Sequence, residues 1–166
     1  GYENVVAVHE KQLECRQIGN DLLTASDLLT NEVRKYVQFG NRTYYDNYWK
    51  EANETKTMEK VISRLKELDI PQDELELVEL AVKNSDALIE VEEAAMDAVA
   101  NNDFDTARRL VFGNQYEEAV QEIKAPINAF LEKMNKRLDA EAEAINKKLD
   151  DYIRLIIIFI ALIIVC

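Results

Sequence analysis

Residues that interrupt helices are scarce in this sequence. Four glycines and two prolines occur among 166 residues, which leaves few of the tight turns that a sheet of many short strands requires. Long stretches rich in alanine, leucine, glutamate, lysine and glutamine favour a few long helices instead. A hydrophobic content of 48% is enough for one globular domain with its own core. The sequence therefore predicts an all-α fold.

Basic residues are also in short supply. The chain has 20 lysines and arginines against 32 aspartates and glutamates, which gives a formal net charge of −12. Such a chain has no basic stripe with which to displace counterions from phosphates, so nucleic acid is excluded as a partner. The same charge disfavours binding flat on an anionic lipid surface. An acidic domain of this kind suits a position in water beyond a membrane.

The residue types that perform catalysis or hold metals are nearly absent. The only histidine, His9, has no partner at the spacing of a metal site. Cys15 and Cys166 form neither a disulfide framework nor a metal-binding spacing. No nucleophile elbow and no phosphate-binding glycine loop occurs. The sequence therefore predicts a protein that is not an enzyme and that has no metal or cofactor.

Only one long hydrophobic run is present, and it lies at the C-terminal end. About 12 consecutive apolar residues extend from Leu155 to Cys166, fewer than the roughly 17 to 25 of a membrane-spanning helix. No polar residue, proline or glycine closes the run. We therefore expect residues 153–166 to be the start of a truncated transmembrane helix and residues 1–152 to be a water-soluble domain. Because no signal peptide is visible, an export signal is expected upstream of Gly1.

The first 39 residues show one continuous helical pattern, from Tyr2 to Phe39. Its inward positions alternate at spacings of three and four residues, as in a helix that packs in a bundle or coiled coil. Gly19 on this seam allows another helix to approach closely, and Gly40 supplies a stop signal. The seam consists of Val8, Cys15, Leu22, Ser26, Leu29, Val33 and Tyr36.

Three more long helices and one short helix are predicted. The second long helix runs unbroken over about 41–68, the third over about 71–101, and the fourth over 114–152 and on into the apolar run. A short helix capped by Asp103 links the third to the fourth. The expected inward face of the second helix is Tyr45, Trp49, Ala52, Thr55, Met58, Val61 or Ile62, and Leu65. In the third helix two inward positions stay open, between Leu88 and Ile89 and between Val91 and Glu92.

Short connections force neighbouring helices to run antiparallel. The expected architecture is therefore an antiparallel up-down-up-down four-helix bundle whose last helix continues into a transmembrane segment. This threading places the turn at Gly40 and the link 101–114 at one end, away from the membrane. That end is here called the loop end.

Arginine and aromatic side chains gather at the loop end of this otherwise acidic chain. Guanidinium groups suit carboxylates, and aromatic faces suit an amine or an apolar group, so a small organic acid or amino acid is the expected ligand. The alternative is that the aromatic residues form the upper core and the arginines pair with nearby acids. Tyr44 and Tyr116 belong to the same group, and the candidate ligand-binding residues are Arg34, Tyr36, Arg42, Tyr45, Tyr48, Trp49, Arg108 and Arg109.

Two stretches resemble a known family. Ser26–Val37, followed by Gly40 and Tyr45–Glu51, is similar to the first helical hairpin of the four-helix-bundle sensor domains of bacterial methyl-accepting chemotaxis proteins. Asn102–Gly113, followed by Tyr116, resembles the link between helices three and four of the same domains. Similar bundles also precede histidine kinases and diguanylate cyclases, so the resemblance indicates the sensor fold more closely than the output.

The resemblance implies a transmembrane chemoreceptor that forms a homodimer in the inner or plasma membrane, with residues 1–152 periplasmic or extracellular. It also implies a HAMP module and a signalling module beyond Cys166, which would control the chemotaxis kinase. Receptors of this shape read amino acids through arginines of the first helix, for which Arg34 is the nearest candidate. The alternatives are the sensor of a histidine kinase or diguanylate cyclase, and a structural or interaction bundle without a ligand.

Overall fold

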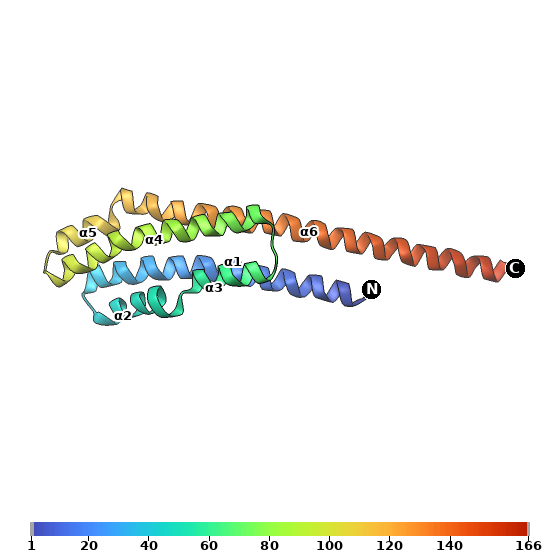
Figure 1. The fold of residues 1–166 in the computed structure, drawn as a ribbon, viewed down its shortest axis with the longest axis horizontal. Coiled ribbons are helices and arrows are strands. Elements are labelled where there is room, and N and C mark those ends of the chain that lie inside the picture. Colours follow the sequence, from blue (N-terminus) through green and yellow to red (C-terminus); the bar gives the residue numbers. More distant parts are fainter. Residues whose placement is uncertain (1, 166) are drawn as a thin grey trace. The chain divides into compact units, whose positions relative to one another are not determined.

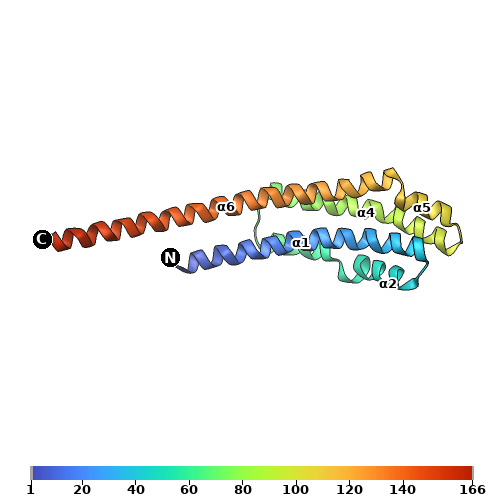
Figure 2. The same ribbon diagram turned by 180° about the vertical axis from the view of Figure 1, so that it is seen from behind.

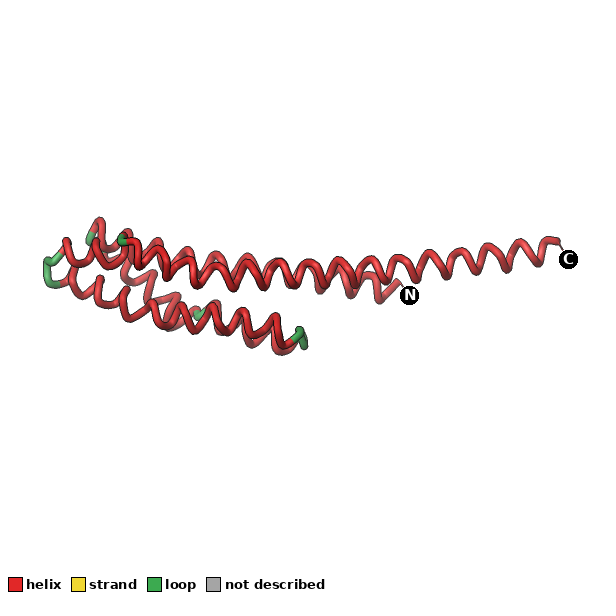
Figure 3. The backbone as a smooth tube through the Cα atoms, turned by 90° about the horizontal axis from the view of Figure 1, so that it is seen from above, coloured by secondary structure: helices red, strands yellow, loops and turns green. Residues whose placement is uncertain are grey.

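The computed structural model describes residues 2–165 and is helical almost throughout (Figure 1). No strand occurs among these residues, and only short connections separate the helices (Figure 3). The predicted all-α class is therefore confirmed. The elements are α1 (Tyr2–Phe39), α2 (Arg42–Lys50), the π-helix η1 (Glu51–Thr55), α3 (Thr57–Glu67), α4 (Gln72–Ala100), α5 (Phe104–Phe112) and α6 (Asn114–Val165).

The chain divides into two compact units. Unit 1 comprises Gly1–Arg16 and Glu132–Cys166, and unit 2 comprises Gln17–Leu131. Helices α1 and α6 each contribute residues to both units. Gly1 and Cys166, the outer ends of the two predicted segments 1–152 and 153–166, lie outside the described residues.

Helix α1 confirms the predicted bounds and the predicted seam. It runs from Tyr2 to Phe39 and ends at Gly40, whose φ of 63° is a conformation that glycine adopts without strain. The Gly40 N–H donates to the Tyr36 carbonyl at 2.7 Å, which closes the last turn. Val8 is half-buried, whereas the other six seam residues are buried: Cys15, Leu22, Ser26, Leu29, Val33 and Tyr36.

Gly19 marks a close approach between α1 and α6 within unit 2. A Cβ atom at this position would collide with Cδ2 of Leu131. We expect Gly19→Ile to lower the free energy of unfolding by about 1–3 kcal/mol, because the added side chain overpacks this contact. Urea unfolding followed by circular dichroism measures the change.

A second substitution tests the cause of that loss. Leu131→Ala removes the colliding atom and should restore part of the stability that Gly19→Ile loses. Leu13→Ala, at an α1 leucine that is 67% exposed, should restore none. A Gly19→Ile variant as stable as the unmodified chain would contradict the close approach.

The prediction of one unbroken second helix is wrong. The segment splits into α2, η1 and α3, and Lys56 takes a left-handed conformation with a φ of 48°. Glu51 holds this break together, because its carbonyl accepts the Lys56 N–H at 2.8 Å and its carboxylate accepts the Thr57 N–H at 2.9 Å. Glu51 is therefore buried although it is acidic.

The break also corrects the predicted inward face. Tyr48 is fully buried, whereas Tyr45, Trp49 and Ala52 are only half-buried. A π-turn adds a residue to the helical repeat, so the buried faces before and after it are out of register. After the break, Met58, Val61 and Leu65 are buried as predicted.

Helices α4 and α5 agree with their predicted positions. Helix α4 follows Pro71 directly, and its two open inward positions are occupied by buried Leu88 and buried Glu92. Asp103 caps α5 as predicted, with its side chain accepting the Thr106 N–H at 3.2 Å.

Polar contacts tie the helices of unit 2 together. The Asn84 side chain of α4 donates to the Glu122 carbonyl of α6 at 2.9 Å, and α4 lies beside this first part of α6 (Figure 2). Lys124 of α6 forms an ion pair with Asp27 of α1 at 2.5 Å. The core of unit 2 includes Phe130, which is fully buried.

Unit 1 pairs the first part of α1 with the later part of α6. The Gln12 side chain donates to the Leu138 carbonyl at 3.0 Å, and this hydrogen bond is buried. A groove of about 700 Å³ lies between the two helices and is lined by apolar residues that include Val5, Val8 and Leu149.

The apolar end of α6 is exposed along its length. Exposed fractions range from 44% at Ile156 to 78% at Ile164 among its large hydrophobic residues from Leu155 onward. Within residues 2–165, no helix combines the length and the apolar character needed to cross a membrane.

Candidate functional site

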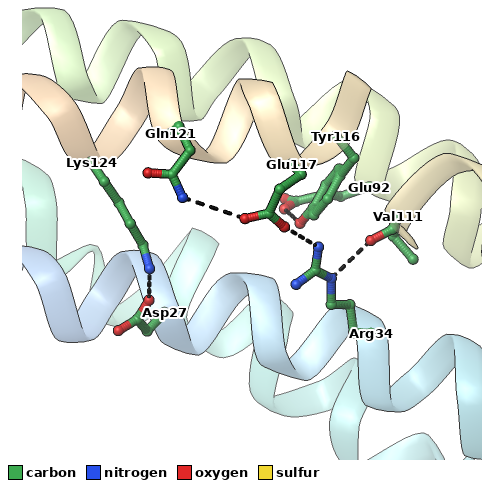
Figure 4. A network of polar contacts seen from close by, with 8 residues as sticks. All are labelled: Asp27, Arg34, Glu92, Val111, Tyr116, Glu117, Gln121 and Lys124. Carbon is green, nitrogen blue, oxygen red and sulfur yellow. Dashed lines mark hydrogen bonds and ion pairs between the residues drawn. The ribbon is translucent and has the colours of Figure 1, made fainter. Parts of the chain in front are cut away.

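Arg34 joins α1 to α5 and α6 at the loop end (Figure 4). Its Nε donates to the Val111 carbonyl at 2.8 Å, and its Nη2 donates to the Glu117 carboxylate at 2.9 Å. The guanidinium carbon also lies 5.1 Å from the ring centre of Tyr116 and 5.4 Å from that of Phe112, which allows cation–π attraction. The Arg34 side chain remains 26% exposed to solvent.

A buried carboxylate lies next to this arginine site. Glu92 of α4 is 2% exposed and accepts hydrogen bonds from the hydroxyl groups of Tyr48 on α2 and Tyr116 on α6, the latter at 2.6 Å. Each tyrosine donates to a different oxygen of the carboxylate. One acidic side chain therefore connects three helices.

The burial of this cluster changes the acidity of its members. Burial raises the pKa of the Glu92 carboxyl, and the hydrogen bonds from Tyr116 and Tyr48 oppose that rise. Burial also raises the pKa values of the Tyr48 and Tyr116 hydroxyls, and the nearby Glu92 charge raises them further. Both tyrosines are therefore neutral donors across the physiological pH range.

Four aromatic residues form a second cluster at the same end. The ring centres of Tyr36 and Tyr45 are 5.4 Å apart, those of Tyr45 and Trp49 are 6.2 Å apart, and those of Tyr48 and Trp49 are 5.0 Å apart. The Arg42 guanidinium covers the Tyr45 ring at 4.0 Å from its centre. The indole N–H of Trp49 is buried and has no hydrogen-bond partner.

The other three candidate arginines bond to neighbours on their own helices. Arg42 forms an ion pair with Asp46 at 3.2 Å, and Arg108 forms one with Asp105 at 3.4 Å. Arg109 donates to the Thr106 hydroxyl at 3.1 Å. Arg108 and Arg109 are exposed on α5.

The structure therefore sorts the eight candidates into three groups. Arg34 stands with Tyr116 and Phe112, while Arg108 and Arg109 lie exposed on α5. The other five are the four residues of the aromatic cluster and Arg42, which covers the Tyr45 ring: Tyr36, Arg42, Tyr45, Tyr48 and Trp49. The aromatic residues pack together and Arg34, Arg42 and Arg108 pair with acids of the chain, as the alternative expectation describes. Ligand binding by these residues stays a prediction.

Two acidic residues at or next to the Arg34 site were not predicted from the sequence. Glu92 was left as one of two options for an inward position, and Glu117 was not connected with Arg34. The spacing from Leu88 to Glu92 to Met96 places all three on one helix face, which is the one signal that could have marked Glu92 as buried.

A small cavity lies beside the π-helix. Its volume is about 30 Å³, which suits a water molecule but not an amino acid. Glu51, Ser85 and Asp86 contribute to its lining. Burial raises the pKa of the Asp86 carboxyl, and the nearby Glu59 charge adds to this rise. Among the residues described, no group of three or more histidine, cysteine, aspartate or glutamate side chains could hold a metal ion.

The Arg34 contacts predict a measurable loss on substitution. Arg34→Met keeps an apolar side chain against the two rings but removes both hydrogen bonds. We expect the free energy of unfolding to fall by about 1–2 kcal/mol, a range that allows for the partial exposure of the pair. Arg108→Met, at an exposed pair within α5, should leave the stability nearly unchanged.

Arg34→Met should also change the pKa of the Glu117 carboxyl. The hydrogen bond from Arg34 holds the pKa of the Glu117 carboxyl below its ordinary value of 4.5, with help from Gln121. This stabilisation is present above pH 4.5 and is lost as the pH falls through the lower, folded-state pKa. In Arg34→Met the pKa of Glu117 should return toward 4.5, as read from its side-chain NMR signals. An unchanged pKa would contradict the pairing.

Comparison with protein-family models, with curated proteins and with solved structures finds no match for this chain.

Proposed function

We propose that the chain is the extracytoplasmic sensor region of a transmembrane chemoreceptor of the methyl-accepting kind. In this proposal its helices form an antiparallel up-down-up-down four-helix bundle, and the last helix continues into a membrane span. A small organic acid or amino acid binds at the loop end, and its binding is transmitted as a helix shift. Two copies form a homodimer, and HAMP and signalling modules follow Cys166.

The observation that carries this proposal is the continuity of α6. One unbroken helix contains both Glu117, which pairs with Arg34, and the exposed apolar run that begins at Leu155. A continuous helix transmits a displacement of one end to the other with little loss. Shifts of about 1–2 Å are typical of helices that carry signals between packed states.

The Arg34 site offers a way to start such a shift. A ligand carboxylate has the same geometry as the Glu117 carboxylate and suits the same guanidinium group. If the ligand takes the place of Glu117 beside Arg34, the direct ion pair between α1 and α6 is lost. The ligand then connects the two helices over a different distance. The ligand then favours one helix packing over another, to the extent that it binds one of them more tightly.

A second candidate function is a structural or interaction bundle that binds no small molecule. The pairing of Arg34, Arg42 and Arg108 with acids of the same chain favours it, because paired arginines need no ligand. In this alternative the acidic helical surface contacts another protein or keeps two membranes or domains apart.

A receptor hybrid distinguishes the two candidates. The chain replaces the sensor region of a chemoreceptor, and kinase activity in membranes is measured against a panel of amino acids and organic acids. The sensor proposal expects at least one compound to change the activity, and expects Arg34→Met to remove that response while Arg108→Met preserves it. A hybrid that assembles with the kinase but responds to no compound would favour the structural alternative.

A further inference from the structure

Glu92 is an acid whose surroundings contain hydroxyl groups rather than cations. Tyr48 approaches from α2 and Tyr116 from α6, and both donate to its carboxylate. From α1, the Thr30 hydroxyl lies within hydrogen-bonding reach of Tyr116. Neither donor carries a charge, so the negative charge of an ionised Glu92 is stabilised only by hydrogen bonds.

The charged groups around the cluster have other partners. Arg34 of α1 faces the ring of Tyr116 but directs its hydrogen bonds to Val111 and Glu117. Glu32 of α1 is buried and accepts from Lys35 at 3.0 Å and from Asn47 of α2 at 3.0 Å.

Another charge on α4 near the cluster is also negative. Glu93 of the same helix acts on Tyr48 through its charge. An added negative charge makes ionisation of Glu92 less favourable. Taken together, the surroundings supply hydrogen bonds to the carboxylate but leave its charge without a direct cationic partner.

The two protonation states of Glu92 require different hydrogen bonds. The ionised carboxylate accepts at both oxygens, which matches the two tyrosine donors. A neutral carboxyl group carries one O–H that must donate, so one tyrosine hydroxyl has to turn and accept it. Tyr116 can do this because the Thr30 hydroxyl, which is hydrogen-bonded to Tyr116, can turn and accept the Tyr116 proton. Within residues 2–165, the Tyr48 hydroxyl bonds to Glu92 and to no second hydroxyl group.

We propose that Glu92, Tyr48 and Tyr116 form a proton-operated switch that sets how α2 is held against α4 and α6. One proton from solvent binds the Glu92 carboxylate, and no other bond is made or broken apart from hydrogen bonds. Loss of the negative charge weakens the hydrogen bond from Tyr48 and thereby changes the packing of Tyr48 against Trp49. The switch does not require the ligand proposed for the loop end.

The direction of the pH effect follows from the burial of Glu92. Burial raises the pKa of this carboxyl above its ordinary value of 4.5, and the two tyrosine hydrogen bonds limit the rise. Between pH 4.5 and the raised pKa, the folded chain binds more protons than the unfolded chain. The contribution of Glu92 to stability therefore decreases as the pH rises through this window and is constant above it.

The single tryptophan of the chain reports on the switch. Trp49 meets Tyr48 edge to face at 5.0 Å between ring centres. Its fluorescence is recorded during a pH titration, while far-UV circular dichroism confirms that the helices persist. We expect one transition with the slope of a single proton and a midpoint above pH 4.5. Side-chain carbon NMR of labelled glutamate should show one carboxyl with the same midpoint.

Variants assign the transition to the three residues. Glu92→Gln imitates the neutral carboxyl, since its amide donates once and accepts once, so it should fold and show no transition. Glu90→Gln, at an exposed position of the same helix, should leave the transition unchanged. Tyr116→Phe removes a donor to the carboxylate and should move the midpoint to higher pH.

Two results would overturn the proposal. One is a fluorescence transition that persists in Glu92→Gln, which would place the titrating group elsewhere. The other is a folded, unmodified chain whose fluorescence and glutamate signals show no titration above pH 4.5.

Discussion

Replacing Tyr48 by alanine should lower the free energy of unfolding by about 3–5 kcal/mol, the range for removing a large buried aromatic ring. Tyr48 has no exposed surface and is among the largest fully buried side chains of the described residues. The substitution opens a cavity and also removes one of the two donors to the buried Glu92 carboxylate. Urea unfolding followed by circular dichroism measures the loss.

Tyr45 supplies the matched control for this prediction. The sequence pattern placed Tyr45 on the inward face of the second helix, whereas the structure leaves it half-buried. Tyr45→Ala should therefore cost only about 1–2 kcal/mol. Tyr48→Phe, which keeps the ring and removes the hydroxyl, should cost about 1–3 kcal/mol. A larger loss of the free energy of unfolding for Tyr45→Ala than for Tyr48→Ala would contradict the burial of these residues in the structure. It would support the inward face that the sequence predicts.

Inserting two glycines after Leu149 in a receptor hybrid should abolish ligand control of the kinase. Each glycine destabilises a helix interior by about 1 kcal/mol relative to alanine, so two of them weaken the helix at this place. The two added residues also rotate every following residue about the helix axis. Kinase activity should then be the same with and without ligand. Ligand binding should be retained, because the insertion lies far along α6 from Glu117.

An insertion that preserves the helix is the control for this result. Seven helix-forming residues at the same place add about two turns and keep the following residues near their original rotation. This variant should retain ligand control in large part. If the two-glycine variant still responds to ligand, the signal does not travel through a continuous α6.

Elements with local signals were predictable from the sequence. The seam of α1 repeats at five positions spaced seven residues apart, and Gly40 stops the helix, so both its bounds and its buried face were correct. Helix α5 was correct because Asp103 caps it and Gly113 follows it. In each case the residues that decide the structure lie within a turn or two of the element itself.

The break in the second helix has no such signal. Neither glycine nor proline occurs between Glu51 and Thr57, yet Lys56 takes a positive φ. Tertiary packing decides this conformation, because Tyr48 before the break and Met58 after it must both reach the core. Helix periodicity alone carries a single register through the segment and cannot anticipate the change.

The candidate site was predictable in its composition but not in its contacts. The pairs of Arg42 and Arg108 lie within one turn of the same helix. In contrast, the partner of Arg34 is 83 residues away, and the two donors to Glu92 are 44 and 24 residues away. A charged residue at an inward position argues against burial until its partners are known, so the choice between Val91 and Glu92 stayed open.

The sensor proposal depends most directly on whether the chain itself binds a small ligand near Arg34. The melting temperature of the chain, measured against a panel of amino acids and organic acids, tests this. A ligand at a concentration 100 times its dissociation constant stabilises the folded state by about 2.7 kcal/mol, which produces a clear rise in melting temperature. We predict such a rise for at least one compound, retained in Arg108→Met and lost in Arg34→Met. No rise with any compound, or an equal rise in Arg34→Met, would contradict the proposal.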